Sequence, residues 1–104
     1  MSDPEPLLQR LEAVIAARDE QRPAGSYTAE LLHGGPSIIS AKVIEEAYEL
    51  VEAIAGLEAG HTMSAEVAHE AADLVFHLLV ALRAAGVRWA DIERELDHRF
   101  TGGR

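Results

Sequence analysis

The chain has 104 residues, 18 of them acidic and 9 basic, which gives a formal net charge of −9. This acidic balance argues against a nucleic-acid backbone or an anionic membrane as the main partner. Cysteine is absent, so the sequence excludes a disulfide scaffold, a thiolate zinc site and a cysteine nucleophile. Hydrophobic residues make up 48% of the chain, which is enough for a core. A chain this short buries only about 60–70% of its unfolded surface, so oligomerisation would help it.

No apolar run reaches the roughly 18–20 residues that cross a membrane. The first six residues are acidic and lack the pattern of a signal peptide. We therefore expect a cytoplasmic protein that forms a single domain over 1–104, with disordered tails at 1–5 and 101–104.

Glycine and proline divide the sequence into helices, and no segment shows the sustained alternation of a strand. In the first segment, apolar residues recur at the spacing of an amphipathic helix. The predicted helices cover about 6–20, 26–35, 36–57, 64–85 and 89–100.

Capping residues mark the ends of these helices. Ser26 or Thr28 is the expected N-cap of the short second helix, and the segment 62–64 is the expected cap of the fourth. Gly86 is expected to end the fourth helix. The predicted fold class is all-α, a bundle of about four to five helices completed by homodimerisation.

The helix predicted over 36–57 carries its charges on one side. Such a charged arc, taken alone, is most often a solvated face. At about 100° per residue, an arc of about 120° contains Lys42, Glu45, Glu46, Glu49 and Glu52.

The helix predicted over 64–85 is apolar nearly all round. Its polar residues Glu66, Glu70, Asp73 and His77 lie within a stripe of about 60°. A helix of this kind is buried, and an unpaired buried carboxylate costs several kcal/mol. Because Lys42 is the only lysine available for pairing, a divalent metal ion is the simplest explanation.

The spacing of the acidic residues also favours a metal site. Glu46 and Glu49 lie one turn apart, and so do Glu70 and Asp73, which places the Cβ atoms of each pair about 5–6 Å apart. If the two helices pack antiparallel, both pairs converge on one cavity. Four carboxylates without cysteine suit a hard ion such as Mg²⁺ or Mn²⁺.

Histidine at position 77 has two interpretations. It follows Asp73 by four residues and could join the ligands, as histidines do in di-iron bundles. No Glu-x-x-His pair lies on the stripe, however, so we favour a core histidine that is hydrogen-bonded to a neighbouring carboxylate. His61, His69 and His98 have no partner at ligand spacing and are interpreted as surface or structural residues.

Three segments carry a family resemblance: residues 26–32 (SYTAELL) with Arg18 upstream, residues 42–46 (KVIEE) and residues 70–80 (EAADLVFHLLV). Together they resemble the all-α nucleoside triphosphate pyrophosphohydrolases, the MazG-like superfamily. Within it, the chain most resembles the phosphoribosyl-ATP pyrophosphatase family of histidine biosynthesis, over about 8–96. Residues 45–55 also resemble the house-cleaning members of the superfamily, which hydrolyse ordinary nucleotides.

This resemblance implies hydrolysis of phosphoribosyl-ATP to phosphoribosyl-AMP and pyrophosphate. It implies Mg²⁺ held by Glu46, Glu49, Glu70 and Asp73, an ion that neutralises the triphosphate and stabilises charge at the attacked phosphorus. Glu46 and Glu49 are thereby catalytic. Glu45 is also predicted to be catalytic, as the group that positions or deprotonates the attacking water. The alternative for Glu45 is a solvent-facing carboxylate.

The resemblance further implies that Arg18, Tyr27, Thr28 and Lys42 bind the substrate. Each has a plainer interpretation: Arg18 as a surface residue, Tyr27 as a core aromatic, Thr28 as a helix cap and Lys42 as the partner of its acidic neighbours.

The resemblance implies that the partner is a small nucleotide. We expect no nucleic-acid partner and no membrane partner. The resemblance also implies a homodimer or a dimer of dimers, with the substrate site near the subunit interface. It implies a functional link to a separate phosphoribosyl-AMP cyclohydrolase, because 104 residues leave no room for that module here. Two other functions stay open: a house-cleaning nucleotide pyrophosphatase, and a non-enzymatic helical module that binds a basic partner through its acidic stripe.

Overall fold

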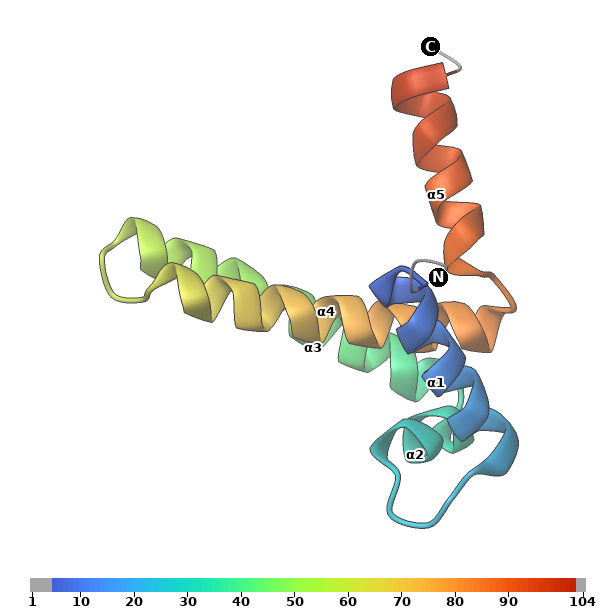
Figure 1. Ribbon diagram of the computed structural model, residues 1–104. Coiled ribbons are helices and arrows are strands. Elements are labelled where there is room, and N and C mark those ends of the chain that lie inside the picture. The colour runs from blue at the N-terminus through green and yellow to red at the C-terminus, as the bar shows by residue number, and fades with distance from the viewer. Residues whose placement is uncertain (1–4, 103–104) are drawn as a thin grey trace.

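The computed structural model describes residues 5–102, and within this range every regular element is a helix (Figure 1). The all-α prediction is confirmed, and the predicted helix bounds agree closely with the observed ones. The last helix continues into a π-helical turn, η1. In chain order the elements are α1 (Leu7–Gln21), α2 (Tyr27–Gly34), α3 (Pro36–Glu58), α4 (Ser64–Ala85), α5 (Trp89–Asp97) and η1 (His98–Gly102).

The two longest helices, α3 and α4, form an antiparallel pair around which the other helices are arranged (Figure 1). Pro36 is the first residue of α3, where its missing N–H would have no helical partner in any case. Gly86 ends α4 in the left-handed region, with φ of 74°, as predicted. The antiparallel arrangement brings the middle of α3 beside the middle of α4, which is where both acidic pairs lie.

The hydrophobic core lies at the end of this pair where α1 and α2 pack onto it. Trp89, at the start of α5, packs against the core. All of the first four helices contribute buried side chains to it, namely Ile15, Leu31, Leu32, Ile39, Leu79 and Val80. The half of the α3–α4 pair nearest the connecting loop has no covering helix in the described chain (Figure 1).

Burial of α4 is less complete than its composition predicts. Ala68 and Ala72 on α4 are exposed, because α1 and α2 are too short to cover the whole pair. On α3, the apolar residues Ile44, Tyr48 and Val51 are between 61% and 71% exposed. We call these three residues the α3 apolar stripe. An exposed apolar stripe of this kind is typical of an interaction surface.

The caps of the helices agree only in part with prediction. Ser26 is the N-cap of α2, and its Oγ accepts a hydrogen bond from the backbone N–H of Ala29 at 3.1 Å. Before α4, the expected side-chain cap is absent: Met63 occupies the N-cap position and makes no side-chain cap bond. Thr62 instead donates from Oγ1 to the carbonyl of Ala53 at 2.9 Å. This bond ties the connecting loop back to α3.

Helix α5 projects away from the other helices (Figure 1). Only its first half is attached to α1, where Glu12 accepts a hydrogen bond from the backbone N–H of Trp89 at 2.6 Å and Gln9 donates to Glu93 at 2.9 Å. Near its end, Leu96 is 47% and Phe100 74% exposed. The outer half of α5 therefore makes little contact with the body of the described chain.

The expected disordered tails fall mostly on residues 1–4 and 103–104, which lie outside the described range. Residues 101 and 102 continue the helix as part of η1, and Thr101 donates from Oγ1 to the carbonyl of Asp97 at 2.9 Å. No helix in the described range is long and apolar enough to cross a membrane.

Two adjacent isoleucines on α3 test the position of the core. Ile39 is 1% and Ile38 52% exposed, so Ile39→Ala should lower the free energy of unfolding by about 2–5 kcal/mol and Ile38→Ala by less than about 1 kcal/mol. Chemical denaturation followed by circular dichroism measures both. Equal losses for the two variants would contradict the placement of the core.

Candidate functional site

The acidic residues predicted to bind metal come together where α3 and α4 face each other. On α3, carboxylate oxygens of Glu45, Glu46 and Glu49 lie within 4.8 Å of one another. On α4, oxygens of Glu70 and Asp73 lie within the same distance of each other and of a His69 ring nitrogen. We call these acidic residues and His69 the acidic cluster.

Glu49 connects the two halves of the acidic cluster. Burial, followed by hydrogen bonding and charge repulsion from Glu49, raises the pKa of Glu46 above its ordinary value. The same causes, in the same order, raise the pKa of Glu70 on the opposite helix. Glu49 therefore lies near both Glu46 and Glu70, and it lines one pocket together with Glu70, so the acidic residues of α3 and α4 face each other.

Two oxygens of the acidic cluster lack partners. Glu46 is 6% exposed, and its Oε2 atom is buried without a hydrogen-bond partner in the described structure. The same is true of Oε2 of Glu70. Buried carboxylate oxygens without partners are costly unless they are protonated or bind a cation. The oxygen-only set of Glu46, Glu49, Glu70 and Asp73 fits a hard divalent ion such as Mg²⁺.

Lys42 offsets only part of this negative charge. Its Nζ atom lies 3.1 Å from Oε2 of Glu45 and 3.7 Å from Oε1 of Glu46. The hydrogen bond to Glu45 is the main reason that the pKa of Lys42 is raised. The plainer interpretation of Lys42, pairing with its acidic neighbours, is therefore what the structure shows.

A shallow pocket of about 260 Å³ opens beside the acidic cluster. Besides Glu49 and Glu70, it is lined by two acidic side chains, Glu52 and Glu66, that the list of predicted ligands leaves out. Their signal was present in the sequence, since Glu52 follows Glu49 by one turn and Glu66 precedes Glu70 by one turn.

Three of the predicted substrate-binding residues share a second, open pocket of about 610 Å³ at the turn between α1 and α2. Arg18 comes from the end of α1, whereas Tyr27 and Thr28 come from the start of α2. Tyr27 is 48% exposed, so it is not the core aromatic of the plainer interpretation. We call this space the Tyr27 pocket.

His77 connects the Tyr27 pocket to the acidic cluster. The ring is 6% exposed, with Nε2 2.8 Å from the Tyr27 hydroxyl and Nδ1 2.7 Å from the backbone carbonyl oxygen of Asp73. A core histidine was expected, and the burial confirms it. The expected carboxylate partner was wrong, because the partners are a carbonyl and a phenol.

His69 is exposed, as predicted, but the expectation that it has no partner at ligand spacing was wrong. Its Nε2 atom lies 3.5 Å from Oδ2 of Asp73, four residues further along α4. This i, i+4 spacing was the signal that could have identified it, because residues four apart are neighbours on a helix.

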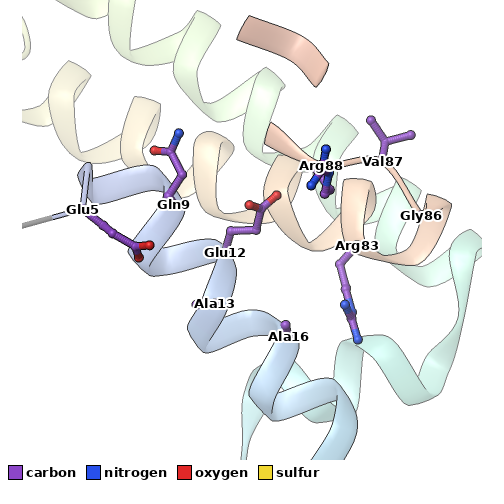
Figure 2. A pocket seen from close by; sticks show the side chains of 9 residues that line it. All are labelled: Glu5, Gln9, Glu12, Ala13, Ala16, Arg83, Gly86, Val87 and Arg88. Carbon is purple, nitrogen blue, oxygen red and sulfur yellow. The ribbon is translucent and has the colours of Figure 1, made fainter. Parts of the chain in front are cut away.

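A different pocket, of about 420 Å³, lies between α1, the end of α4 and the start of α5 (Figure 2). None of the predicted site residues lines it. Its Arg83 is paired with Asp19 at 2.9 Å, and its Glu12 holds the first turn of α5. These charged groups fasten helices to one another, and the pocket lies nearly three turns along α4 from Asp73.

The fold and this site define an all-α protein with a candidate divalent-metal site between two antiparallel helices. The model of the phosphoribosyl-ATP pyrophosphohydrolase family matches residues 8–100, and the chain belongs to this family. A protein named phosphoribosyl-ATP pyrophosphatase from Paracoccus denitrificans is 45% identical over 95% of this chain and 88% of its own length. Another of that name, from Rhizorhabdus wittichii, is 46% identical over 88% of this chain and 82% of its own.

A longer type of relative also matches. The histidine biosynthesis bifunctional protein HisIE of Xanthomonas campestris is 43% identical over 92% of this chain. The match covers 44% of that protein, so the larger part of it lies outside the region shared with this chain.

The raised pKa values of Glu46 and Glu70 predict the pH dependence of stability without metal. A carboxyl with a raised pKa binds more protons in the folded state than in the unfolded state. The free energy of unfolding should therefore fall as the pH rises above the ordinary value of 4.5. Thermal denaturation in EDTA across this range measures the effect.

Two glutamate-to-glutamine variants serve as controls for this measurement. Glu46→Gln removes the titrating group and should flatten the dependence, whereas Glu58→Gln, an exposed change on the same helix, should leave it as in the wild type. Stability that rises with pH in the wild type would contradict the burial of the acidic cluster.

Proposed function

We propose that this chain hydrolyses phosphoribosyl-ATP to phosphoribosyl-AMP and pyrophosphate in histidine biosynthesis, with bound Mg²⁺ or Mn²⁺. Membership of the family and the names of the relatives support the substrate and the reaction. The acidic composition and the absence of cysteine support a cytoplasmic location.

The observation that carries the metal-dependent part of the proposal is the pair of partnerless oxygens, Oε2 of Glu46 and Oε2 of Glu70. They belong to opposite helices, and Glu49 lies near both side chains, so a cation held there would supply partners that the described chain does not. We propose Glu46, Glu49, Glu70 and Asp73 as its ligands. When bound, Mg²⁺ supplies charge neutralisation for the triphosphate and polarises the phosphoryl group that is attacked.

Each remaining charged group has a proposed task. Without a cation, the acidic cluster repels a triphosphate, so substrate binding should depend strictly on metal. The Glu45 side chain is 54% exposed, which leaves it open to accept a proton from the attacking water. Lys42 bridges Glu45 and Glu46 and is proposed to donate to a phosphate oxygen.

The Tyr27 pocket is the proposed site for the rest of the substrate. Its volume of about 610 Å³ lies in the range of small-molecule sites, about 300–1,000 Å³. Arg18, Tyr27 and Thr28 are its proposed contacts. Tyr27 reaches the acidic cluster through His77 and Asp73, so one elongated nucleotide would contact both places.

Release of pyrophosphate is the direct test of the reaction. The wild type with Mg²⁺ should release pyrophosphate from phosphoribosyl-ATP and lose this activity in EDTA. Glu49→Gln should lower kcat/KM by about 10²-fold or more, because a metal ligand worth several kcal/mol is lost. Glu58→Gln, exposed at the end of α3, should keep full activity.

The competing functions give different results in the same assay. Preference for ordinary dNTPs over phosphoribosyl-ATP would indicate a house-cleaning enzyme with the same metal site. If no nucleotide is turned over and Mg²⁺ leaves the thermal stability unchanged, the acidic cluster is not a metal site, since a ligand of the folded state must stabilise it.

We also propose that the chain forms a homodimer, or a dimer of dimers, through the α3 apolar stripe. Ile44, Tyr48 and Val51 recur along one side of α3 and are left uncovered in the single chain. A symmetric pair would bury the same stripe from both copies. The longer bifunctional relatives support a functional link to a second activity, proposed to be a phosphoribosyl-AMP cyclohydrolase.

A charge placed on the stripe tests this assembly. Ile44→Glu should shift the molar mass measured by light scattering towards that of a single chain, because the charge would be buried in the interface. Met63→Glu adds the same charge at a residue 76% exposed in the loop before α4 and should not change the mass. A wild type with the mass of one chain would contradict the dimer.

A further inference from the structure

We infer that His77 is a positioning residue that fixes the proton of the Tyr27 hydroxyl, so that Tyr27 offers the Tyr27 pocket only a hydrogen-bond acceptor. The group recognised there is then a donor of the nucleoside, either a ribose hydroxyl or an exocyclic amine, and not a phosphate oxygen. This inference rests on the proposed function, because it concerns the same substrate pocket.

The direction of the hydrogen bonds follows from chemistry. A backbone carbonyl can only accept, so Nδ1 of His77 must donate to the carbonyl of Asp73, 2.7 Å away. We infer a neutral imidazole, because neither of its hydrogen-bond partners is a carboxylate; its other nitrogen is then an acceptor. The Tyr27 hydroxyl, 2.8 Å from Nε2, is therefore the donor in that contact.

Packing holds the imidazole in this orientation. The Phe76 ring meets the His77 ring edge to face, with centroids 5.0 Å apart, and the Tyr27 ring lies 6.3 Å from Phe76. Both contacting nitrogens of the buried ring are occupied, so a flip of the ring would break two hydrogen bonds at once.

The consequence concerns what Tyr27 can recognise. Its single proton is used by His77, and its oxygen lone pairs remain for the half-exposed side towards the pocket. Ionised phosphate oxygens are hydrogen-bond acceptors only. A phosphate facing Tyr27 would therefore place two acceptor oxygens next to each other with no proton between them. A hydroxyl or amine donor completes the contact instead. The phosphates are thereby left to the acidic cluster and its cation.

The experiment measures dissociation constants of AMP and of pyrophosphate by calorimetry in the presence of Mg²⁺. Tyr27→Phe should raise the AMP constant about three- to tenfold, the loss of one hydrogen bond, and leave the pyrophosphate constant unchanged. His77→Asn keeps the donor to Asp73 but loses the acceptor for Tyr27, so the Tyr27 proton is no longer fixed; it should weaken AMP binding, but less than Tyr27→Phe does, because the hydroxyl can still accept. His77→Gln can place an acceptor near the Nε2 position and should restore AMP binding.

Further variants and ligands sharpen the test. The double variant His77→Asn with Tyr27→Phe should bind AMP no more weakly than Tyr27→Phe alone, because His77 acts only through the Tyr27 hydroxyl. His98→Asn makes the same change as His77→Asn at an exposed histidine outside the pocket and should bind AMP as the wild type does. IMP lacks the exocyclic amine, so the amine is the donor if Tyr27→Phe does not weaken the binding of IMP. The ribose 2′-hydroxyl is the donor if Tyr27→Phe does not weaken the binding of 2′-deoxy-AMP.

Nitrogen NMR of the His77 ring gives a readout that does not depend on ligand or activity, with His77→Asn used for assignment. The neutral Nδ1–H tautomer is expected, and either the Nε2–H tautomer or a doubly protonated ring overturns the inference. Equal weakening of AMP and pyrophosphate by Tyr27→Phe overturns it too, as does absence of AMP binding by the wild type. Failure to hydrolyse phosphoribosyl-ATP while this binding pattern holds would refute the proposed function alone.

Discussion

The structure depends on holding like charges together between two helices. Glu49 lies beside both Glu46 and Glu70 at the contact of α3 with α4, and it raises the cost of ionising each of them. Lys42 is the one cation paired with this group in the described chain, and it also pairs with Glu45. Such an arrangement opposes folding, so its energy must be supplied elsewhere in the molecule.

The free energy that offsets this cost comes from the hydrophobic core, which lies at the other end of the α3–α4 pair. There, α1 and α2 bury apolar side chains against α3 and α4, including Ile39 and Val80 at 1% and 0% exposure. Asp19 adds a tie between α1 and α4 through Arg83, at 2.9 Å. The hydrophobic core and the acidic cluster thus lie in different parts of the molecule. The two long helices α3 and α4 run through both parts and connect them.

Local order could be predicted from the sequence, because helix periodicity and the stops at Gly86 and before Pro36 act within a few residues. The convergence of the two acidic pairs was also predictable, given an antiparallel pairing of their helices. The partners of His77 were not, because a backbone carbonyl and a phenol fifty residues away leave no trace in residue spacing. The incomplete cover of α4 was missed for a similar reason, since composition does not say how far short helices reach.

The α3 residues of the acidic cluster lie on the same helix as the α3 apolar stripe, and this links the proposed metal site to the proposed dimer. Ile44 and Tyr48 precede Glu45 and Glu49 directly, so a partner that covers the stripe also removes water from the edge of the acidic cluster. Removing water strengthens both the repulsion among carboxylates and their attraction to a cation. Association without metal is then opposed, and association with metal is favoured. Because such coupling is reciprocal, a metal that promotes pairing of the chains must also be bound more tightly by the pair.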